Sequence, residues 1–371
     1  MNLYIGLMSG TSMDGIDAAL MDVDTNALIG GITRPYSDEV RQHLNLVLNE
    51  KVGFETFCQL NTLLGREFAL AVHQLLESVN VSVQDVVAIG SHGQTICHDA
   101  MAKVPYTLQL GCAHTIAEFT GLPVVADFRT RDLVIGGQGA PFAPMYHQAL
   151  FGQESTSRVL VNIGGISNVT TLVHGEAASG YDVGPGNCLM DLWAHKHIGT
   201  PYDANGAWAA KGQIIHPLLD LLLADDYFKL PAPKSIGKEY FSWAWLERFI
   251  LPDYSAVDVQ ATLMALTASS IADAIQQQKT YPEQVMICGG GAHNITLCLE
   301  LANQLPQLDV FSTKQVGVNP DFIEAMMFAW LAEKAIKQIP LDFGAITGAK
   351  KTAIYGAIYP AGLDKGNWLK V

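Results

Sequence analysis

The chain has little positive charge. Its 371 residues include 22 Lys and Arg against 36 Asp and Glu, so the formal net charge is −14. Nucleic-acid-binding proteins usually carry a basic patch, and anionic membranes attract basic segments, so we expect neither partner. No apolar run reaches the roughly 18 residues of a spanning helix. No basic segment precedes an apolar run at the N-terminus, so we expect no secretory signal.

Cysteine is also scarce, and the common metal and nucleotide motifs are missing. The six cysteines are scattered, with no Cys-x-x-Cys pair, which is typical of reduced thiols in a cytoplasmic protein. There is no His-Glu-x-x-His, and His195 and His197 lie two residues apart on a predicted helix, where they face different sides. We therefore expect no zinc site. A P-loop is also excluded, because the nearest candidate, at 344–352, is one residue short, and no Gly-x-Gly-x-x-Gly follows a strand.

Glycine-rich turns, by contrast, are prominent. Residues 3–24 read as a strand, the turn Gly10-Thr-Ser-Met-Asp-Gly15, and a second strand; residues 159–173 repeat the pattern around Gly164 and Gly165. Such turns let backbone N–H groups converge on an anion, because Gly adopts φ > 0 and leaves no side chain in the way. Three further glycines, Gly289–Gly291, follow a short apolar strand. Each turn alone favours a tight connection, but three together favour nucleotide binding.

The length and the pattern predict two α/β lobes. A chain of 371 residues exceeds one ordinary core. The mixture of hairpins and alternating elements predicts a mixed sheet with helices on both faces, built twice. We place the boundary between about 128 and 155 and draw it as 1–130 and 131–371, with a C-terminal tail that could return to the first lobe. Residues 200–258 are rich in proline and aromatics and read as an insertion that shapes a substrate pocket.

Strand and helix patterns locate the elements. Strands are expected at 3–8, 16–22, 84–91, 121–127, 158–163, 168–173 and 285–288. Helices are expected at 61–79, 188–198, 258–278 and 321–338.

Two aspartates are candidates for chemistry. Asp182 lies within the stretch Gly180 to Asn187, which we read as a turn of glycines and a proline. There it is either a general base or a turn residue that bonds its own backbone. Asp14 lies in the first glycine turn and is either a Mg²⁺ ligand, through water, or again a turn residue. Thr11 and Ser12 either donate to phosphate or cap the turn.

Polar residues at two strand ends are candidates for binding the substrate. Arg129 and Arg131 follow one predicted strand and either clamp an anionic group or form surface ion pairs. His92, in Ser-His-Gly-Gln-Thr, follows another and offers the same choice.

Seven motifs, in register from residue 3 to about 360, resemble one family. They are Gly-Leu-Met-Ser-Gly-Thr-Ser-Met-Asp-Gly-Ile-Asp, Ser-His-Gly-Gln-Thr, Asp-Phe-Arg-x-x-Asp, Gly-Gly-Gln-Gly-Ala-Pro, Asn-Ile-Gly-Gly-Ile-Ser-Asn, Gly-Tyr-Asp-x-Gly-Pro-Gly-Asn and Cys-Gly-Gly-Gly. The chain resembles the anhydro-N-acetylmuramic acid kinases. They belong to the actin/hexokinase/Hsp70-like ATPases, which implies two lobes with ribonuclease H-like five-stranded sheets and an active site in the cleft between them.

The resemblance implies a reaction and roles for named residues. With ATP and Mg²⁺, water would open the 1,6-anhydro bridge while O6 takes the γ-phosphoryl group, giving N-acetylmuramic acid 6-phosphate and ADP in peptidoglycan recycling and amino-sugar catabolism. Asp182 would be the base that activates the water, and Glu324 would help hold the sugar. We also expect His92 at the sugar, and Arg129 or Arg131 at its lactyl carboxylate, because an acidic protein needs a local cation to bind an anionic sugar. The implied ATP site comprises Gly10, Thr11, Ser12, Met13, Asp14, Gly15, Ile16, Asp17, Gly164, Gly165, Gly289, Gly290, Gly291 and Asn294.

The resemblance also implies a cytoplasmic homodimer. Two other functions stay open from the residues alone. One is a different sugar or carboxylate kinase of the same superfamily, and the other is a non-catalytic ATP-driven switch. Turnover of unbridged N-acetylmuramic acid alone would favour the first, and ADP release that depends on the anhydro sugar would exclude the second.

Overall fold

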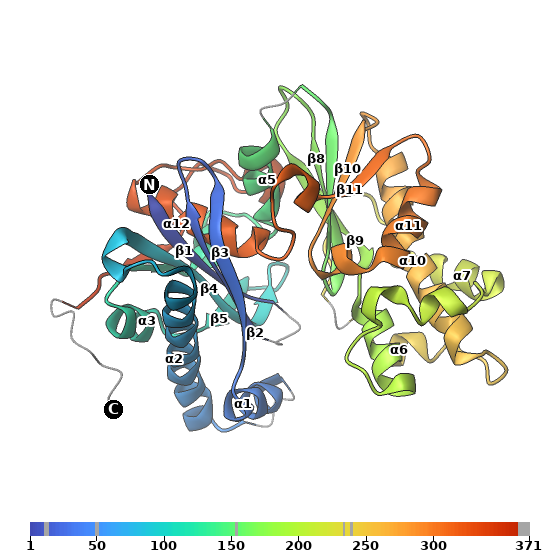
Figure 1. Cartoon of the computed structure of the whole chain (residues 1–371), viewed down its shortest axis with the longest axis horizontal. Helices are drawn as coiled ribbons and strands as arrows, with labels where there is room; N and C mark the ends of the chain where they lie inside the picture. Colours follow the sequence, from blue (N-terminus) through green and yellow to red (C-terminus); the bar gives the residue numbers. More distant parts are fainter. Residues whose placement is uncertain (11–14, 49–51, 153–154, 233, 238–239, 363–371) are drawn as a thin grey trace. The chain divides into compact units, whose positions relative to one another are not determined.

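The computed structural model divides the chain into two compact units (Figure 1). Unit 1 comprises Met1–Tyr146 and Phe322–Val371, and unit 2 comprises His147–Asp321. The division falls after residue 146, inside the expected range of 128–155 but later than the 130/131 at which we drew it. The chain after residue 321 belongs to unit 1, so more than a C-terminal tail returns. The structure describes residues 1–10, 15–48, 52–152, 155–232, 234–237 and 240–362.

Unit 1 is built on a mixed sheet of seven strands among its described residues. The strands are β1 (Leu3–Ser9), β2 (Gly15–Asp22), β3 (Ala27–Pro35), β4 (Val86–Asp99), β5 (Tyr106–Leu110), β6 (Val124–Ala126) and β12 (Ala357–Tyr359). Their order is β12-β6-β4-β1-β2-β3, and β5 pairs with the far part of β4. β1, β4 and β6 are parallel, whereas β2, β3 and β12 pair in antiparallel fashion.

Helices cover both faces of this sheet. The helices of unit 1 are α1 (Asp38–Leu48), α2 (Phe54–Val79), α3 (Ala113–Thr120), α4 (Phe128–Val134), α5 (Ala143–Phe151, which runs on into unit 2), α12 (Ile323–Ile336) and α13 (Gly344–Thr347). Ile5 of β1 packs in the core with Leu64 and Phe68 of α2. The next residue, Gly6, points the other way, and a Cβ there would lie 1.7 Å from the carbonyl oxygen of Ala325. Because neighbouring strand residues face opposite sides, α2 and α12 lie on opposite faces.

Unit 2 repeats the plan with five strands among its described residues. They are β7 (Arg158–Ile163), β8 (Ile166–Leu172), β9 (Ser179–Pro185), β10 (Gln284–Cys288) and β11 (Asp309–Ser312), in the order β11-β10-β7-β8-β9. The two hairpin pairings are antiparallel, and β7, β10 and β11 are parallel. The helices are α6 (Cys188–Ile198), α7 (His216–Leu223), α8 (Asp226–Lys229), α9 (Trp243–Leu246), α10 (Ala256–Gln276) and α11 (Ile295–Gln304).

The strand order confirms the prediction of one mixed α/β plan built twice. In both units the first three strands form an antiparallel meander, and the two later strands add in parallel beside the first. The expected five-stranded sheet is correct for unit 2, whereas β5 and β12 extend that of unit 1. The helix expected at 188–198 has those bounds, and the other three predicted helices agree to within a few residues at most ends.

Five strands escaped prediction: β3, β5, β9, β11 and β12. β9 was read as a turn because it contains Gly180, Gly184 and Pro185. Pairing with β8 over most of its length outweighs these weak propensities, since strand formation depends chiefly on neighbouring strands.

Candidate active site

Three strand ends meet at one edge of the second sheet. β7 and β10 are parallel neighbours, and β9 runs in the same direction because two antiparallel pairings separate it from β7. Their carboxyl ends therefore lie at one edge, which we call the carboxyl edge of unit 2. Gly164 and Gly165 follow β7, Gly186 and Asn187 follow β9, and Gly289 follows β10. Ligand sites of α/β proteins gather at such edges.

Main-chain hydrogen bonds join the glycine turn to the start of α6. The amide of Gly186 donates to Gly165 O (2.9 Å), and the amide of Asn187 donates to Gly164 O (2.8 Å). The amide of Cys188 also donates to Gly165 O (3.2 Å). The Asn187 side chain donates from Nδ2 to Ile163 O (3.1 Å). The turn is thus held by its carbonyl oxygens, and no side chain of the turn is needed for its position.

The glycines at this edge fall into two groups: those that the packing or the backbone conformation requires, and those that neither requires. A Cβ on Gly186 would lie 2.3 Å from Gly164 O, and one on Gly291 would lie 2.3 Å from Ile163 Cγ2. Gly289 has φ +75°, which L side chains rarely adopt. These three are required by the fold itself.

Gly164, Gly165 and Gly290 are not required in this way. The nearest atoms to a Cβ at these positions would be 3.5, 4.0 and 3.9 Å away, ordinary contact distances or beyond. Neither Gly164 nor Gly165 has a positive φ, so our premise that the second turn uses φ > 0 is wrong. A Cβ would fit at these positions without a clash, so the fold does not require glycine there, and the absence of a Cβ suits the close approach of a ligand.

Asn294, predicted to bind ATP, is the N-cap of α11. Its Oδ1 accepts from the amide of Leu297 (3.0 Å), and its own amide donates to Gly291 O (3.0 Å). The residue therefore connects the three-glycine loop to the helix that follows it. Its side-chain oxygen is engaged by the helix.

Asp182 lies in strand β9, not in a turn as predicted. It pairs with Asn168 of β8 and is half-buried. Its carboxylate Oδ2 accepts from the Ser235 hydroxyl (3.0 Å) and from the Ile236 amide (3.0 Å). Two donors on one oxygen orient the carboxylate. Both donors lie more than 50 residues away along the chain, so these bonds tie Asp182 to the 200–258 segment and not to a local turn.

In unit 1, a buried side-chain network holds the two ends of the first glycine turn. Ser9 Oγ lies 2.8 Å from both Gly15 O and Gln94 Oε1, and it accepts from the Tyr36 hydroxyl at 2.8 Å. Gln94 Nε2 donates to Gly10 O (3.2 Å). Burial raises the pKa of Tyr36, so the phenol stays protonated and donates. Both ends of the turn are therefore fixed from within the sheet.

The residues of the first glycine turn that were predicted to bind ATP are only partly described by the structure. Thr11, Ser12, Met13 and Asp14 lie outside the described residues. Ile16 is fully buried, so only its main chain could face a ligand. Asp17 Oδ1 accepts from the Thr33 hydroxyl of β3 at 2.6 Å.

His92 and Arg129 form one cluster in unit 1. His92 lies where the register of β4 shifts against β1. Arg129 Nε donates to His92 Nε2 (2.9 Å), and Arg129 Nη1 donates to Gly139 O (2.8 Å). Burial, aided by the positive charge of Arg129, holds the pKa of His92 well below its ordinary value, so the imidazole is neutral. A neutral ring accepts from the guanidinium and fixes its direction.

The other two predicted sugar contacts are placed differently. Arg131 is exposed on α4, two residues from Arg129. Glu324 lies in the first turn of α12, one helical turn before Phe328, whose ring lies 4.7 Å from that of His92. Unit 1 therefore brings Arg129 and His92 into contact and places Glu324 on the helix that packs against them.

Sequence reasoning missed Asp132 and the two donors to Asp182. Asp132 is fully buried and accepts from the amide of Gly139 (2.7 Å) and the hydroxyl of Thr347 (2.9 Å). It thereby supports the loop whose Gly139 oxygen binds Arg129. The Asp-Phe-Arg-x-x-Asp spacing contained this residue, but nothing in it indicated a partner more than 200 positions away. No sequence signal pointed to Ser235 or Ile236.

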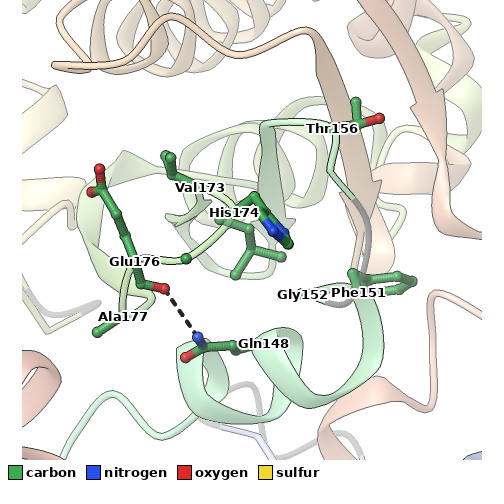
Figure 2. A pocket seen from close by; sticks show the side chains of 10 residues that line it. Gln148, Phe151, Gly152, Thr156, Val173, His174, Glu176 and Ala177 are labelled. Carbon is green, nitrogen blue, oxygen red and sulfur yellow. Dashed lines mark hydrogen bonds between the residues drawn. The ribbon is translucent and has the colours of Figure 1, made fainter.

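A separate cavity lies at the opposite end of the second sheet. It has a volume of about 340 Å³ and lies between α5 and the turn that joins β8 to β9 (Figure 2). Gln148 Nε2 donates to Glu176 O (3.1 Å) at its rim. It contains none of the residues predicted for the site.

Among the residues that the structure describes, no group of three or more His, Cys, Asp and Glu side chains could hold a metal ion. In the same described ranges, no helix is long and apolar enough to cross a membrane.

Known proteins match nearly the whole chain. The family model described as "Anhydro-N-acetylmuramic acid kinase" matches residues 2–361. Curated relatives of that description from Legionella pneumophila, strains Corby and Paris, are each 57% identical over 361 residues, which is 97% of this chain and 99% of the relative.

Solved structures resemble the chain only distantly. Component A of the (R)-2-hydroxyglutaryl-CoA dehydratase of Acidaminococcus fermentans has a TM-score of 0.47 and 11% identity, covering 89% of this chain and 97% of that one. A ROK family glucokinase from Streptomyces griseus has a TM-score of 0.41 and 15% identity, covering 90% and 100%.

Proposed function

The chain belongs to the anhydro-N-acetylmuramic acid kinase family, and we propose that it uses ATP to phosphorylate O6 of 1,6-anhydro-N-acetylmuramic acid as water opens the anhydro bridge. It is a phosphotransferase with an alcohol group as acceptor. The products are N-acetylmuramic acid 6-phosphate and ADP, as peptidoglycan recycling and amino-sugar catabolism require. This assignment favours the sugar kinase over a non-catalytic switch.

The orientation of Asp182 is the observation that carries the mechanism. Its carboxylate is fixed by Ser235 and Ile236, and Asp182 lies in β9 four residues before Gly186 of the carboxyl edge. As general base, Asp182 takes a proton from the water whose oxygen attacks the anomeric carbon. The bond from that carbon to O6 breaks, O6 attacks the γ-phosphorus, and ADP departs with the bond electrons. No covalent enzyme intermediate is needed.

The glycine turns supply the surroundings of the phosphates. Gly164 and Gly165 carry no side chain and are not closely packed, so phosphate oxygens can approach the main chain there. We assign the same role to the turn that begins at Gly10 and ends at Gly15, and place the adenosine against Gly289–Gly291. Positioning and electrostatic stabilisation are the main parts of phosphoryl transfer.

Magnesium belongs to this proposal through Asp14 alone. That residue lies outside the described residues, and the described part of the chain contains no three-ligand cluster. Mg²⁺ usually keeps several waters and binds one or two carboxylates together with substrate phosphates, so a preformed cage is not needed. When bound, it would neutralise phosphate charge.

Arg129 is our candidate for the lactyl carboxylate of the sugar. Its guanidinium is held by His92 and Gly139 O, whereas Arg131 is exposed. A preoriented guanidinium suits a carboxylate better than a mobile one. We expect a larger rise in the KM for the sugar from Arg129→Ala than from Arg131→Ala, and equal KM values would remove this assignment. His92 and Glu324 complete the proposed sugar contacts.

The decisive experiment is Asp182→Asn, with ATP and the anhydro sugar as substrates. We expect turnover to fall at least about a hundredfold, the scale of general-base loss, while the melting temperature and ATP binding stay unchanged. Asp220→Asn is the matched control, because Asp220 is exposed on α7 of the same unit. Retained turnover in Asp182→Asn would contradict the mechanism. Phosphorylation of unbridged N-acetylmuramic acid alone would contradict the substrate.

The family further leads us to propose a cytoplasmic homodimer. Sedimentation velocity of the purified chain tests the assembly, and a single species of 40.1 kDa would contradict it.

A further inference from the structure

One residue of β9 is bound on three sides by the insertion. The Asp182 amide donates to Lys234 O (3.0 Å), and the Asp182 carbonyl oxygen accepts from the Tyr227 hydroxyl (2.7 Å). Its carboxylate Oδ2 accepts from Ser235 and Ile236. β9 is the last strand of its sheet, so these contacts occupy its outer edge at one position.

The residues that make these contacts are themselves tied to the core of the insertion. Lys234 Nζ donates to Tyr227 O (3.0 Å) and lies 4.6 Å from the centre of the Tyr227 ring. The Tyr227 amide donates to Asp225, which also accepts from the indole of Trp245 (2.8 Å). Tyr227 and Trp245 are both buried. The segment that contacts Asp182 is therefore anchored to buried residues of the insertion and is not an isolated loop.

We propose that Ser235 is a positioning residue for the phosphotransfer reaction, which acts through Asp182 by holding its carboxylate in the direction needed to accept the proton of the attacking water. The proposal rests on the function proposed above. Ser235 and Ile236 donate to the same oxygen, so together they fix the plane and the rotamer of the carboxylate. Ile236 contributes its main-chain amide, which a substitution cannot remove. The Ser235 hydroxyl is the part that a substitution can remove.

The hydroxyl also biases the protonation of Asp182. A hydrogen bond donated to a carboxylate stabilises its ionised form. Without the Ser235 hydroxyl, the carboxylate binds a proton at a higher pH. The acidic limb of the pH–rate profile, along which the base becomes protonated, then moves upward. A merely structural role of Ser235 would lower the amount of folded protein but would not move this limb.

The test is Ser235→Ala with ATP and the anhydro sugar. We expect kcat to fall at least about fivefold, the scale of one lost hydrogen bond, while the KM for ATP stays unchanged. The acidic limb of kcat should move to higher pH. Ser235→Thr, which keeps a hydroxyl, should restore both. Ser235 is exposed, so the melting temperature should not change. Ser155→Ala, an exposed serine before β7 of the same unit, is the control.

The outcomes separate this inference from the proposed function. Wild-type turnover that is lost in Asp182→Asn but unaltered in Ser235→Ala overturns the role of Ser235 alone. If the wild type does not phosphorylate the anhydro sugar, or if Asp182→Asn retains turnover, the proposed function itself is contradicted, whatever the result for Ser235. A fall in kcat with an unmoved acidic limb and no rescue by Ser235→Thr also overturns the positioning role.

Discussion

The two units use the same hairpin at the same place in the same sheet plan, but they hold its turn by different means. In unit 1, the turn between β1 and β2 is held at both ends by the side chains of Ser9 and Gln94, with Tyr36 behind them. In unit 2, the turn between β7 and β8 is held by the amides of residues 186–188. The first arrangement depends on buried polar side chains, and the second on the close approach of two backbones.

This difference decides which substitutions can break each turn. A side-chain network fails when a donor or acceptor is removed, because its buried partner is left unsatisfied. A backbone contact has no side chain to remove and fails when atoms are added in the gap. Ser9 is therefore the sensitive position in unit 1, and Gly186 is the sensitive position in unit 2.

The outer strands of the meanders differ as well. β3 alternates exposed and half-buried residues, whereas β9 is bound by the insertion at Asp182. The insertion is the main departure of unit 2 from the shared plan, and the proposed base lies where it attaches. The repeated fold thus supplies the scaffold, and the unrepeated segment orients the chemistry.

The largest effect on stability should come from Gly186→Ala. The added Cβ would lie 2.3 Å from Gly164 O, and the main chain must shift. We expect the free energy of unfolding to fall by about 3 kcal/mol, together with a loss of activity. Chemical denaturation measures the first and the kinase assay the second.

Gly164→Ala in the partner backbone is the matched control for this prediction. The nearest atom to its Cβ would be 3.5 Å away, so we expect a stability change within about 0.5 kcal/mol. The KM for ATP should nevertheless rise, because the methyl group enters the space proposed for phosphate. Equal stability of the two variants would break the comparison between the turns.

A smaller effect is expected in unit 1 from Ser9→Ala. The change leaves the Tyr36 hydroxyl and Gly15 O without this buried partner, which should cost about 2 kcal/mol of unfolding free energy. Tyr36→Phe removes the donor to Ser9 but leaves the bond between Ser9 and Gly15 O in place, so we expect a loss of only about 1 kcal/mol of unfolding free energy. Urea denaturation of both variants measures these values. A larger loss in Tyr36→Phe than in Ser9→Ala would show that Ser9 is not the centre of the network.

The last effect concerns pH: it is absent at neutral pH, grows as the solution is acidified, and both units should contribute. Burial lowers the pKa of His147 in unit 2 to about 3, and burial together with Arg129 lowers that of His92 in unit 1. Each folded-state pKa lies below the unfolded value of about 6.5, so the unfolded chain binds more protons below that pH. Stability should therefore fall as pH decreases from about 6.5, by about 1.4 kcal/mol per pH unit for each histidine.

The measurement is the apparent unfolding free energy of wild type and His147→Asn at pH 7, 6 and 5. In His147→Asn, the unfolding free energy should fall less steeply with decreasing pH, by about 1.4 kcal/mol per pH unit, and His92→Asn should show a reduction of the same size. An unchanged slope in His147→Asn would show that this imidazole does not stay neutral when the unit folds.

Much of the fold was readable from local pattern. The strands that begin each unit, the helix at 188–198 and the repeated mixed sheet followed from apolar periodicity and glycine placement. β9 and the edge strands did not, because glycine, proline and short length conceal strands that neighbouring strands stabilise. The boundary lies within the expected range of 128–155 but after the 130/131 at which it was drawn. The helix at 323–336 was assigned to the wrong unit, since no local signal shows that the chain returns to unit 1 after residue 321.

The amino-acid sequence by itself determined the family, the repeated strand–turn–strand units and the residue types offered for the chemistry, because these depend on spacing along the chain. Tertiary structure alone decided which glycines the fold requires, that Ser235 and Ile236 orient Asp182, and that Asp132 supports the loop beside Arg129. Some of these contacts join positions more than 200 residues apart. Hydrogen bonding and steric approach act through space, where separation along the chain carries no information.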